Sequence, residues 1–269
     1  ACSAVEARGL ATARRRAMTK RKLDAASELD RSVEDFYAAL GASTSTSWSG
    51  PAAEEPAAAP AVEEPATAAA AAAADLSAMT ADLIAKDIVV LRGMPLPLQQ
   101  ALCDAVAPFA APAAGPSFFR ANNEKTRQTD MLHLGKHFVG GRLCDLGGVP
   151  PLVSLVAAEA QARGTAGGLR LTSPLSAVDV AVVNAYRDGA RLGLHVDRRS
   201  TRHAATPVVA ISLGESAQFV WKRSWKKALA LERLLLRSGD ILIFGGAARA
   251  MVHGVERLEA GSAPAALRL

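Results

Sequence analysis

Three side chains in the C-terminal half of the chain have the types and the spacing to hold a metal ion. His195 and Asp197 lie two positions apart in Leu194–Asp197, at the end of a predicted β-strand. Side chains i and i+2 of a strand share one face, so the imidazole and the carboxylate converge on one point. His253 is the candidate for a third ligand. Two histidines and one carboxylate form the facial triad that binds non-haem Fe(II) and leaves positions open for a cosubstrate and O₂.

A His-x-Asp pair by itself is usually structural, so its surroundings decide the interpretation. The surrounding blocks are, in chain order, Asn184-Ala-Tyr186, Gly189, His195-x-Asp197, Pro207–Gly214, Phe219, Leu234–Asp240, Phe244–Gly246, Arg249 and His253–Val255. In type and order these blocks resemble the AlkB family, the Fe(II)- and 2-oxoglutarate-dependent dioxygenases that remove alkyl groups from nucleic-acid bases. The resemblance covers about residues 178–269 and extends more faintly to Met131–Gly135.

The resemblance implies roles for residues beyond the three metal ligands. Asn184 and Tyr186, two apart on one strand face, would hydrogen-bond 2-oxoglutarate. Arg268 would pair with the distal carboxylate of 2-oxoglutarate, since a guanidinium can bind a carboxylate through two parallel hydrogen bonds. Arg268 stands where the last core strand of the family begins, and the sequence stops at Leu269, so we expect that strand to be cut short. No catalytic residue is expected beyond the metal ligands.

Basic and aromatic residues near these blocks suggest a nucleic-acid substrate. An enzyme that acts on a base needs a single strand or a flipped nucleotide, with cations for phosphates and rings for stacking. The candidate substrate contacts are Arg198, Arg199, Trp221 and His133, the last in the expected substrate lid. Arg202 and His203 extend the first cluster, and Lys222, Arg223, Lys226 and Lys227 surround Trp221 and Trp225. A solvated hairpin with half-buried tryptophans would produce the same pattern.

Arg199 departs from the family pattern. Bacterial repair members carry an acidic residue at this place, two positions after the metal aspartate. An arginine cannot accept a hydrogen bond from a base amino group, so the base specificity of those members does not transfer to this chain. His133 and His137 are four apart, but Gly135 between them argues against a helix that presents both to a metal, and we expect a lid or loop role.

The patterns predict an α+β domain that is mainly β, a double-stranded β-helix (jelly roll) with flanking N-terminal helices. Helices are expected at residues 76–84, Leu98–Val106 and Pro151–Arg163, a strand at Ile88–Leu91, and loop-rich chain at Ala107–Val149. From Val178 onward, short β-type runs alternate with turns. These runs are VDVAVVNAY, TPVVAISLG, AQFVWK, RLLLRSG, DILIFGG and MVHGVERL.

Composition separates this domain, residues 75–269, from residues 1–74. The N-terminal segment is rich in Ala, Pro, Ser and Glu and has too few large apolar residues to fold, so we expect disorder with a short helix at Ala25–Leu40. Its net charge is −2, whereas residues 75–269 carry +7, which favours a polyanionic partner. The basic stretch Arg8–Lys22 is compatible with a nuclear address, a transit segment or a phosphate-binding arm.

The remaining composition narrows the class of protein. Apart from the alanine tract, the chain contains no apolar run long enough for a membrane span, so we expect none. Three cysteines without a CxxC pair exclude a disulfide scaffold or zinc ribbon and fit a reducing, intracellular compartment. The sequence therefore predicts a monomeric enzyme that uses Fe(II) and 2-oxoglutarate to demethylate DNA or RNA. The alternatives are the same chemistry on a protein or lipid, and a non-catalytic nucleic-acid-binding relative.

Overall fold

The structure is a computed structural model that describes residues 75–110, 119–120, 129–139, 142–145, 148–170, 178–186, 189–197 and 206–268. The chain divides into two compact units. The larger contains residues 57–120, 126–137 and 145–269, and it holds all the elements discussed below except the end of β4 and most of β5. The predictions for residues 1–74 lie outside the described residues.

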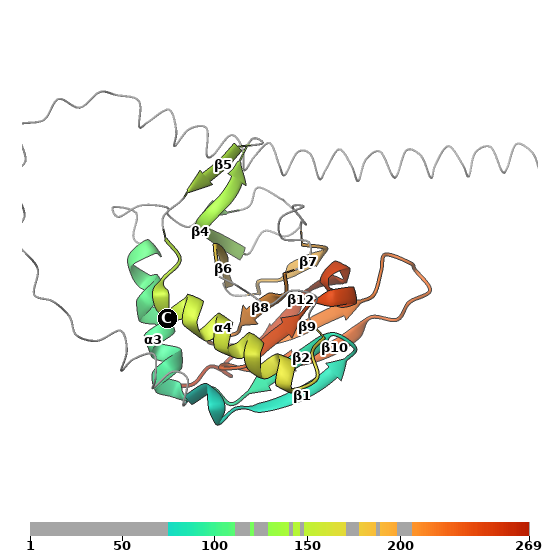
Figure 1. The fold of residues 1–269 in the computed structure, drawn as a ribbon, viewed down its shortest axis with the longest axis horizontal. Coiled ribbons are helices and arrows are strands. Elements are labelled where there is room, and N and C mark those ends of the chain that lie inside the picture. Colours follow the sequence, from blue (N-terminus) through green and yellow to red (C-terminus); the bar gives the residue numbers. More distant parts are fainter. Residues whose placement is uncertain are drawn as a thin grey trace, which may run out of the picture. The chain divides into compact units, whose positions relative to one another are not determined.

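Two four-stranded antiparallel sheets form the body of the larger unit (Figure 1). The first has the order β1 (Thr80–Ala85), β2 (Ile88–Arg92), β11 (Ile241–Phe244), β8 (Val208–Ile211). The second has the order β10 (Glu232–Leu236), β9 (Ser216–Lys222), β12 (Val252–Glu259), β7 (Leu192–His195). A third sheet contains β3 (Phe119–Arg120), β4 (Thr129–Val139) and β5 (Arg142–Asp145), with β6 (Val180–Tyr186) paired to β4.

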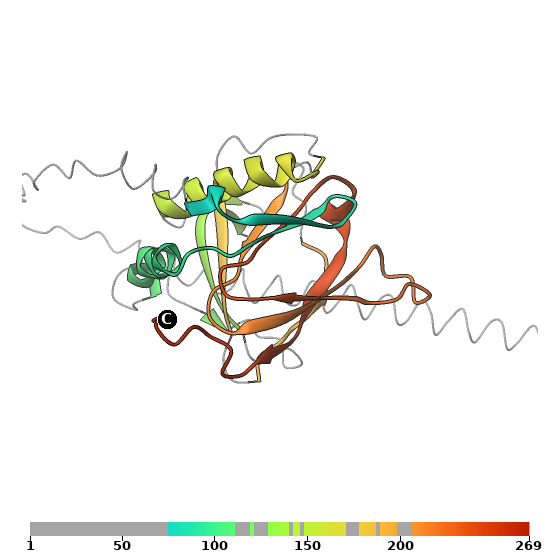
Figure 2. The same ribbon diagram turned by 90° about the horizontal axis from the view of Figure 1, so that it is seen from below.

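Two helices lie on the outer side of the first sheet. They are α3 (Leu96–Ala110) and α4 (Pro151–Ala166), and α4 packs against β2, β8 and β11. Figure 2 shows α4 over this sheet, with the second sheet on the opposite side. A short 3₁₀-helix, η1 (Gly246–Ala250), joins β11 to β12. None of the described helices is long and apolar enough to cross a membrane.

The central strands β2 and β11 explain how the layers hold together. Val89 and Leu91 join the core under the helices, while Ile88 and Val90 join the core between the two sheets. Strand β11 alternates in the same way, because successive side chains of a strand point to opposite faces. Both strands are therefore apolar apart from Arg92 at the end of β2, and their burial on both faces fixes the position of the first sheet.

The strands expected after Val178 are confirmed as β6 and β8 to β12, and the expected strand at Ile88–Leu91 is β2. The helices at Leu98–Val106 and Pro151–Arg163 are confirmed with slightly wider bounds. The helix expected at residues 76–84 is wrong over most of its length: residues 75–77 are helical, but Thr80–Ala85 form β1 and pair with β2. Its apolar residues Leu76 and Met79 nevertheless lie in the core. The loop expected at Ala107–Val149 contains the long strand β4.

The observed class is mainly antiparallel β with few helices, as the sequence predicts. Cys103, expected to pack on an apolar helix face, lies on α3 and is partly buried.

Candidate metal centre

Two neighbouring strands of the second sheet bring the predicted metal ligands together. His195 is the last residue of β7, and it lies directly opposite His253 of the antiparallel strand β12. Asp197 follows two residues after His195. One ligand atom from each residue lies within 4.8 Å of the others. Among the residues that the structure describes, this is the group of His, Cys, Asp and Glu side chains with the spacing of a metal site.

Backbone carbonyls orient both imidazoles for metal binding. The Nδ1 of His195 lies 2.9 Å from the carbonyl oxygen of Gly193, and the Nδ1 of His253 lies 3.3 Å from that of Met251. A carbonyl only accepts hydrogen bonds, so each Nδ1 carries a proton, and each Nε2 is the nitrogen that offers a lone pair to a metal when the ring is neutral. This tautomer is the one that a metal ligand needs, with the opposite ring nitrogen held by a neighbouring group.

His253 lies deeper than His195. Its side chain is 9% exposed, and its ring stacks on Phe219 and meets the edge of Phe244 at centroid distances of 5.7 and 5.3 Å. The rings of His253 and His195 are 4.4 Å apart. Burial lowers the pKa of His253, which favours the neutral imidazole. The side chain of His195 is 37% exposed, so the centre is open on that side.

The two oxygens of Asp197 face different partners. Oδ1 lies 3.3 Å from Nε2 of His195 and 3.5 Å from Nε2 of His253, whereas Oδ2 lies 3.7 Å from Nη1 of Arg249. Burial would raise the pKa of Asp197, but the hydrogen bond from His195 and the charges of both histidines and Arg249 outweigh it and lower that pKa. The carboxylate is therefore ionised, with Oδ1 directed toward the ligand atoms of both histidines.

Arg249 is held rigidly beside Asp197. It is 7% exposed, and its Nε donates to the carbonyl oxygen of Thr206 at 3.1 Å. Its 3₁₀-helix is attached to the β1–β2 turn: the backbone N–H of Gly245 donates to the carbonyl of Asp87, and that of Ala247 donates to the Asp87 carboxylate. Arg249 belongs to the sequence motif, but the sequence alone assigned it no role. A lone arginine after Gly245-Gly246, four positions before His253, was the available signal.

The two predicted cosubstrate ligands lie on β6, in the third sheet. Asn184 is opposite Met131 of β4, and Tyr186 is opposite Thr129, whose hydroxyl donates to the carbonyl of Arg191 just before β7. The Oδ1 of Asn184 is buried and has no hydrogen-bond partner among the described residues. Burial raises the pKa of Tyr186 to about 12, so its phenol is a neutral donor. Both side chains are thus partly buried polar groups, and they lie a few residues before β7, the strand that carries His195.

Arg268 differs from the expectation of a buried cation in a core strand. Its side chain is exposed and it belongs to no strand. The backbone N–H of Arg268 donates to Oε1 of Gln100 on α3, and its carbonyl accepts from Nε2 of Gln100, at 2.9 and 3.2 Å. The end of the described chain therefore lies against α3, and the geometry gives no support to Arg268 as a cosubstrate ligand.

The four predicted substrate contacts differ in where they lie in the structure. Arg198 and Arg199 lie outside the described residues. His133 lies on β4, opposite Val182 of β6. Trp221 is only 7% exposed and belongs to the core between the sheets, so its ring offers no surface for a base. Among the described tryptophans, the one with an exposed indole is Trp225, at 54%.

The donor set fits Fe(II). Two imidazoles, each neutral once it binds a metal, and one ionised carboxylate have ligand atoms within 4.8 Å and match the facial triad in residue type and number. The three ligands come from one side, from β7 and β12, and the partial exposure of His195 leaves access for further ligands.

Comparison with known proteins agrees with this chemistry. Residues 144–269 match the model of the 2OG-Fe(II) oxygenase superfamily. The chain is similar to the DNA N(6)-methyladenine demethylase ALKBH1D of Arabidopsis thaliana, with 39% identity over 99 residues, which cover 35% of this chain and 22% of that protein. It is also similar to the alpha-ketoglutarate-dependent dioxygenase AlkB of Escherichia coli K12, with 40% identity over 86 residues, or 32% of this chain and 39% of that protein.

The fold is similar to that in the solved structure of OsALKBH1, with a TM-score of 0.58 and 23% identity, over 68% of this chain and 91% of that one. In the sequence comparisons, the matching segment spans well under half the length of the curated relatives.

Proposed function

We propose that this chain, an AlkB-like member of the 2OG-Fe(II) oxygenase superfamily, oxidatively dealkylates bases of DNA or RNA. The observation that supports this most strongly is the facial arrangement of His195, Asp197 and His253, with both Nε2 atoms and one carboxylate oxygen directed to one point. Similarity to AlkB and to ALKBH1D supports nucleic acid as the substrate class.

The atoms of the proposed reaction balance with O₂ and 2-oxoglutarate as co-reactants. Fe(II), which His195, Asp197 and His253 would hold, and 2-oxoglutarate would supply the oxidising power for hydroxylation of the alkyl carbon by one oxygen atom of O₂, the other oxygen atom ending in succinate with release of CO₂. The C–N bond of the hydroxyalkyl group then breaks. The carbon leaves as an aldehyde, formaldehyde for methyl, and the hydroxyl proton passes to the base nitrogen.

The chain's own residues position the reactants. Gly193 and Met251 hold the histidines in the metal-binding tautomer, and Arg249 faces the carboxylate oxygen that points away from them. Because its Oδ2 faces Arg249, Asp197 would hold the metal through Oδ1. Phe219 and Phe244 exclude water from the inner side of His253.

Asn184 and Tyr186 are proposed to bind 2-oxoglutarate. A half-turn of the Asn184 amide would place its NH₂ where the buried, unpartnered Oδ1 lies, and that NH₂ would donate to a carboxylate. The neutral phenol of Tyr186 is a second donor. A buried amide oxygen without a described partner favours a ligand that forms a hydrogen bond at this place, because an unpaired buried polar atom is costly.

We also propose that residues 75–269 form one dioxygenase domain with the connectivity of a double-stranded β-helix. Two facing antiparallel sheets, with the metal residues on adjacent strands of one of them, support this assignment.

Succinate formation from 2-oxoglutarate, with Fe(II) and ascorbate, tests the proposed function. The panel contains DNA and RNA oligonucleotides that carry N6-methyladenine or other N-methylated bases, with unmodified strands as controls. We expect one class of methylated strand to stimulate turnover. Turnover without stimulation by any strand would keep the oxygenase but move the substrate to a protein or lipid. Iron binding without any turnover would indicate a non-catalytic relative.

A further inference from the structure

The hairpin between β9 and β10 carries an exposed indole among cations. Residues 216–231 contain Lys222, Arg223, Lys226 and Lys227 and no acidic residue. Trp225 is 54% exposed, and Lys226 and Lys227 are exposed beside it. The loop has its own turn, since the N–H of Leu229 donates to the carbonyl of Lys226. Figures 1 and 2 show the hairpin projecting from the end of the second sheet.

This hairpin starts beside the metal centre. Trp221, at the end of β9, lies directly opposite His253 of β12, and Lys222 lies opposite Val252. Trp221 is buried and anchors the base of the hairpin in the core between the sheets. The guanidinium of Arg223 lies over the Trp221 ring, 5.5 Å from its centroid. A linear ligand bound along the hairpin would thus approach the second sheet at the place where His253 lies.

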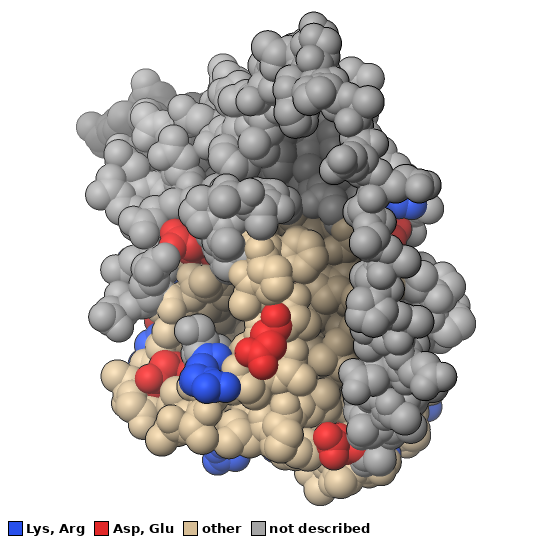
Figure 3. Space-filling view, turned by 90° about the vertical axis from the view of Figure 1, so that its left-hand side faces the viewer, with Lys and Arg blue, Asp and Glu red and all other residues tan. Residues whose placement is uncertain are grey.

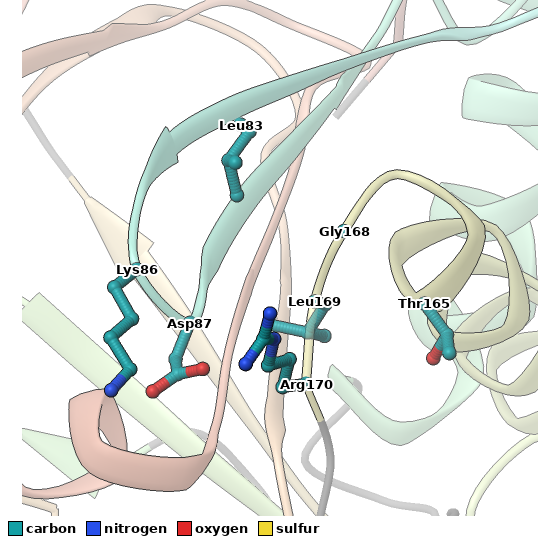
Figure 4. A pocket seen from close by; sticks show the side chains of 7 residues that line it. All are labelled: Leu83, Lys86, Asp87, Thr165, Gly168, Leu169 and Arg170. Carbon is teal, nitrogen blue, oxygen red and sulfur yellow. The ribbon is translucent and has the colours of Figure 1, made fainter.

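The positive charge continues onto the β1–β2 turn. The Nη2 of Arg223 donates to the carbonyl of Lys86 at 2.8 Å. Lys86 and Arg170 line a surface pocket of about 710 Å³, together with Leu83, Thr165, Gly168 and Leu169 (Figure 4). Asp87, the acidic residue of this pocket, turns its carboxylate to the N–H of Ala247 and is 5% exposed. We call Lys86, Arg170, Lys222, Arg223, Lys226 and Lys227 the basic strip.

Residues 216–231 contain no acidic side chain, and Asp87 is the acidic residue that lines the pocket. The acidic residues that flank this range are Glu215, before β9, and Glu232, opposite Trp221 at the start of β10. The exposed pair Arg233–Glu256 neutralises itself at 3.0 Å. The opposite face of the molecule differs: Figure 3 shows scattered single charges of both signs among its described residues.

We infer that the basic strip and Trp225 form a docking site for single-stranded nucleic acid, distinct from the pocket that receives the reacting base. This inference rests on the proposed function for the identity of the occupant. The cations contact backbone phosphates, and the exposed indole stacks on a base of the same strand. The indole projects outward while its neighbour Trp221 is buried, so stacking on Trp225 leaves the core undisturbed.

Binding of a fluorescein-labelled, unmodified single-stranded oligonucleotide, measured by anisotropy at several salt concentrations, tests the inference. The double variant Lys226→Gln/Lys227→Gln should bind more weakly, and its slope of log Kd against log salt should fall by about 0.7 for each phosphate that the variant no longer neutralises. Trp225→Ala should weaken binding about tenfold or more, and Trp225→Phe should restore most of it. Basal succinate formation without an oligonucleotide should not change in these variants.

The matched control is Arg237→Gln/Arg257→Gln. In the register of the second sheet, Arg257 of β12 lies opposite Gln218 of β9, and Arg237 directly follows the β10 residue that lies opposite Ala217 of β9. Both arginines therefore lie at the end of these strands that is farther from the hairpin. This control should bind as the wild type does. Equally weakened binding in the control and hairpin variants, or unchanged binding in the hairpin variants, would overturn the inference. Wild-type binding to phosphatidylserine vesicles but not to the oligonucleotide would also overturn it.

Failure of the proposed function is distinguishable from failure of this inference. Weakened binding in the hairpin variants, with no oligonucleotide able to stimulate turnover in the wild type, would refute the dealkylase and leave the docking site. Stimulated turnover with unchanged binding in the hairpin variants would do the reverse.

Discussion

The guanidinium of Arg249 lies 3.7 Å from Oδ2 of Asp197, while the other oxygen of the same carboxylate faces both imidazoles. This arrangement assigns one oxygen to the metal and the other to the arginine. Since Arg249 is fixed by Thr206 and by a helix attached to the β1–β2 turn, the fold itself sets the orientation of the carboxylate. Removal of a group that orients a metal ligand commonly lowers the affinity for the metal about 10- to 100-fold.

Arg249→Ala should therefore lower the affinity of the apoprotein for Co(II) or Fe(II) by about 10- to 100-fold, measured by calorimetric titration. Arg249→Lys should recover part of that affinity, because the ammonium keeps the charge without the planar guanidinium. Arg163→Ala is the matched control: it removes a part-buried arginine that donates to the carbonyl of Met79, away from the site. Equal metal affinity in Arg249→Ala and the wild type would contradict this assignment.

Gly254 allows a close approach of β7 and β12, the strands that carry His195 and His253. A Cβ at this position would lie 2.5 Å from the carbonyl oxygen of Leu192 on β7. Gly254→Ala should push β7 away from β12, weaken metal binding although no ligand is removed, and destabilise the fold by about 1–3 kcal/mol. Gly148→Ala, where a Cβ would meet nothing within 4 Å, is the control for both metal titration and thermal unfolding. Unchanged metal affinity in Gly254→Ala would show that the strand spacing does not matter.

The two histidines should titrate on opposite sides of the usual imidazole value of 6.5. Burial opposes the charge on His195, but the hydrogen bonds to Asp197 and Gly193 outweigh it and raise its pKa, whereas burial lowers that of His253. In the apoprotein, His195 therefore stays protonated to higher pH, and metal binding must displace that proton. NMR titration of the histidine ring protons checks this, and Asp197→Asn should lower the pKa of His195. A single common pKa for both rings would contradict the prediction.

Asn184→Ala should weaken 2-oxoglutarate binding without weakening metal binding. The Oδ1 of Asn184 is the buried polar side-chain atom without a described partner on β6, and removal of the amide would delete the proposed hydrogen bond to the cosubstrate but no metal ligand. Such a bond to a charged group is worth about 1.5–3 kcal/mol, so the Kd should rise about 10- to 150-fold. Calorimetry with 2-oxoglutarate and Mn(II) measures both affinities. Ala185, the intervening residue on β6, supplies the control Ala185→Ser.

The sequence predicted the strands that carry the site because their signals are local. Short β-type runs bounded by turn residues marked β6 and β8 to β12, and the two-residue spacing of His195 and Asp197 placed His195 at the end of β7. The error at Thr80–Ala85 arose because Leu76, Met79 and Leu83 also fit a helical period. The turn at Lys86-Asp87 was the missed signal, since Asp87 adopts φ +64, a conformation that aspartate tolerates in hairpin turns.

The features that the sequence did not predict depend on contacts between residues far apart in the chain. Strand β4 lies in glycine-rich sequence, and Gly135 at φ +82 keeps the strand continuous where a side chain would meet the backbone of Asp179. Trp221 and Trp225 have similar basic neighbours, but only the pairing of β9 with β12 decides that the first is core and the second is exposed. The contact of Arg249 with Asp197 likewise joins η1 to the residues after β7, which no spacing rule connects.

The most direct test of the proposed dealkylation is mass spectrometry of a methylated oligonucleotide incubated with the protein, Fe(II), ascorbate and 2-oxoglutarate, with formaldehyde measured in the same reaction. Dealkylation at the His195–Asp197–His253 centre predicts demethylated strand and formaldehyde in equal amounts with the wild type, and neither with His195→Ala. Equal product from both proteins, or succinate formed without any change in the strand across the methylated panel, would contradict it.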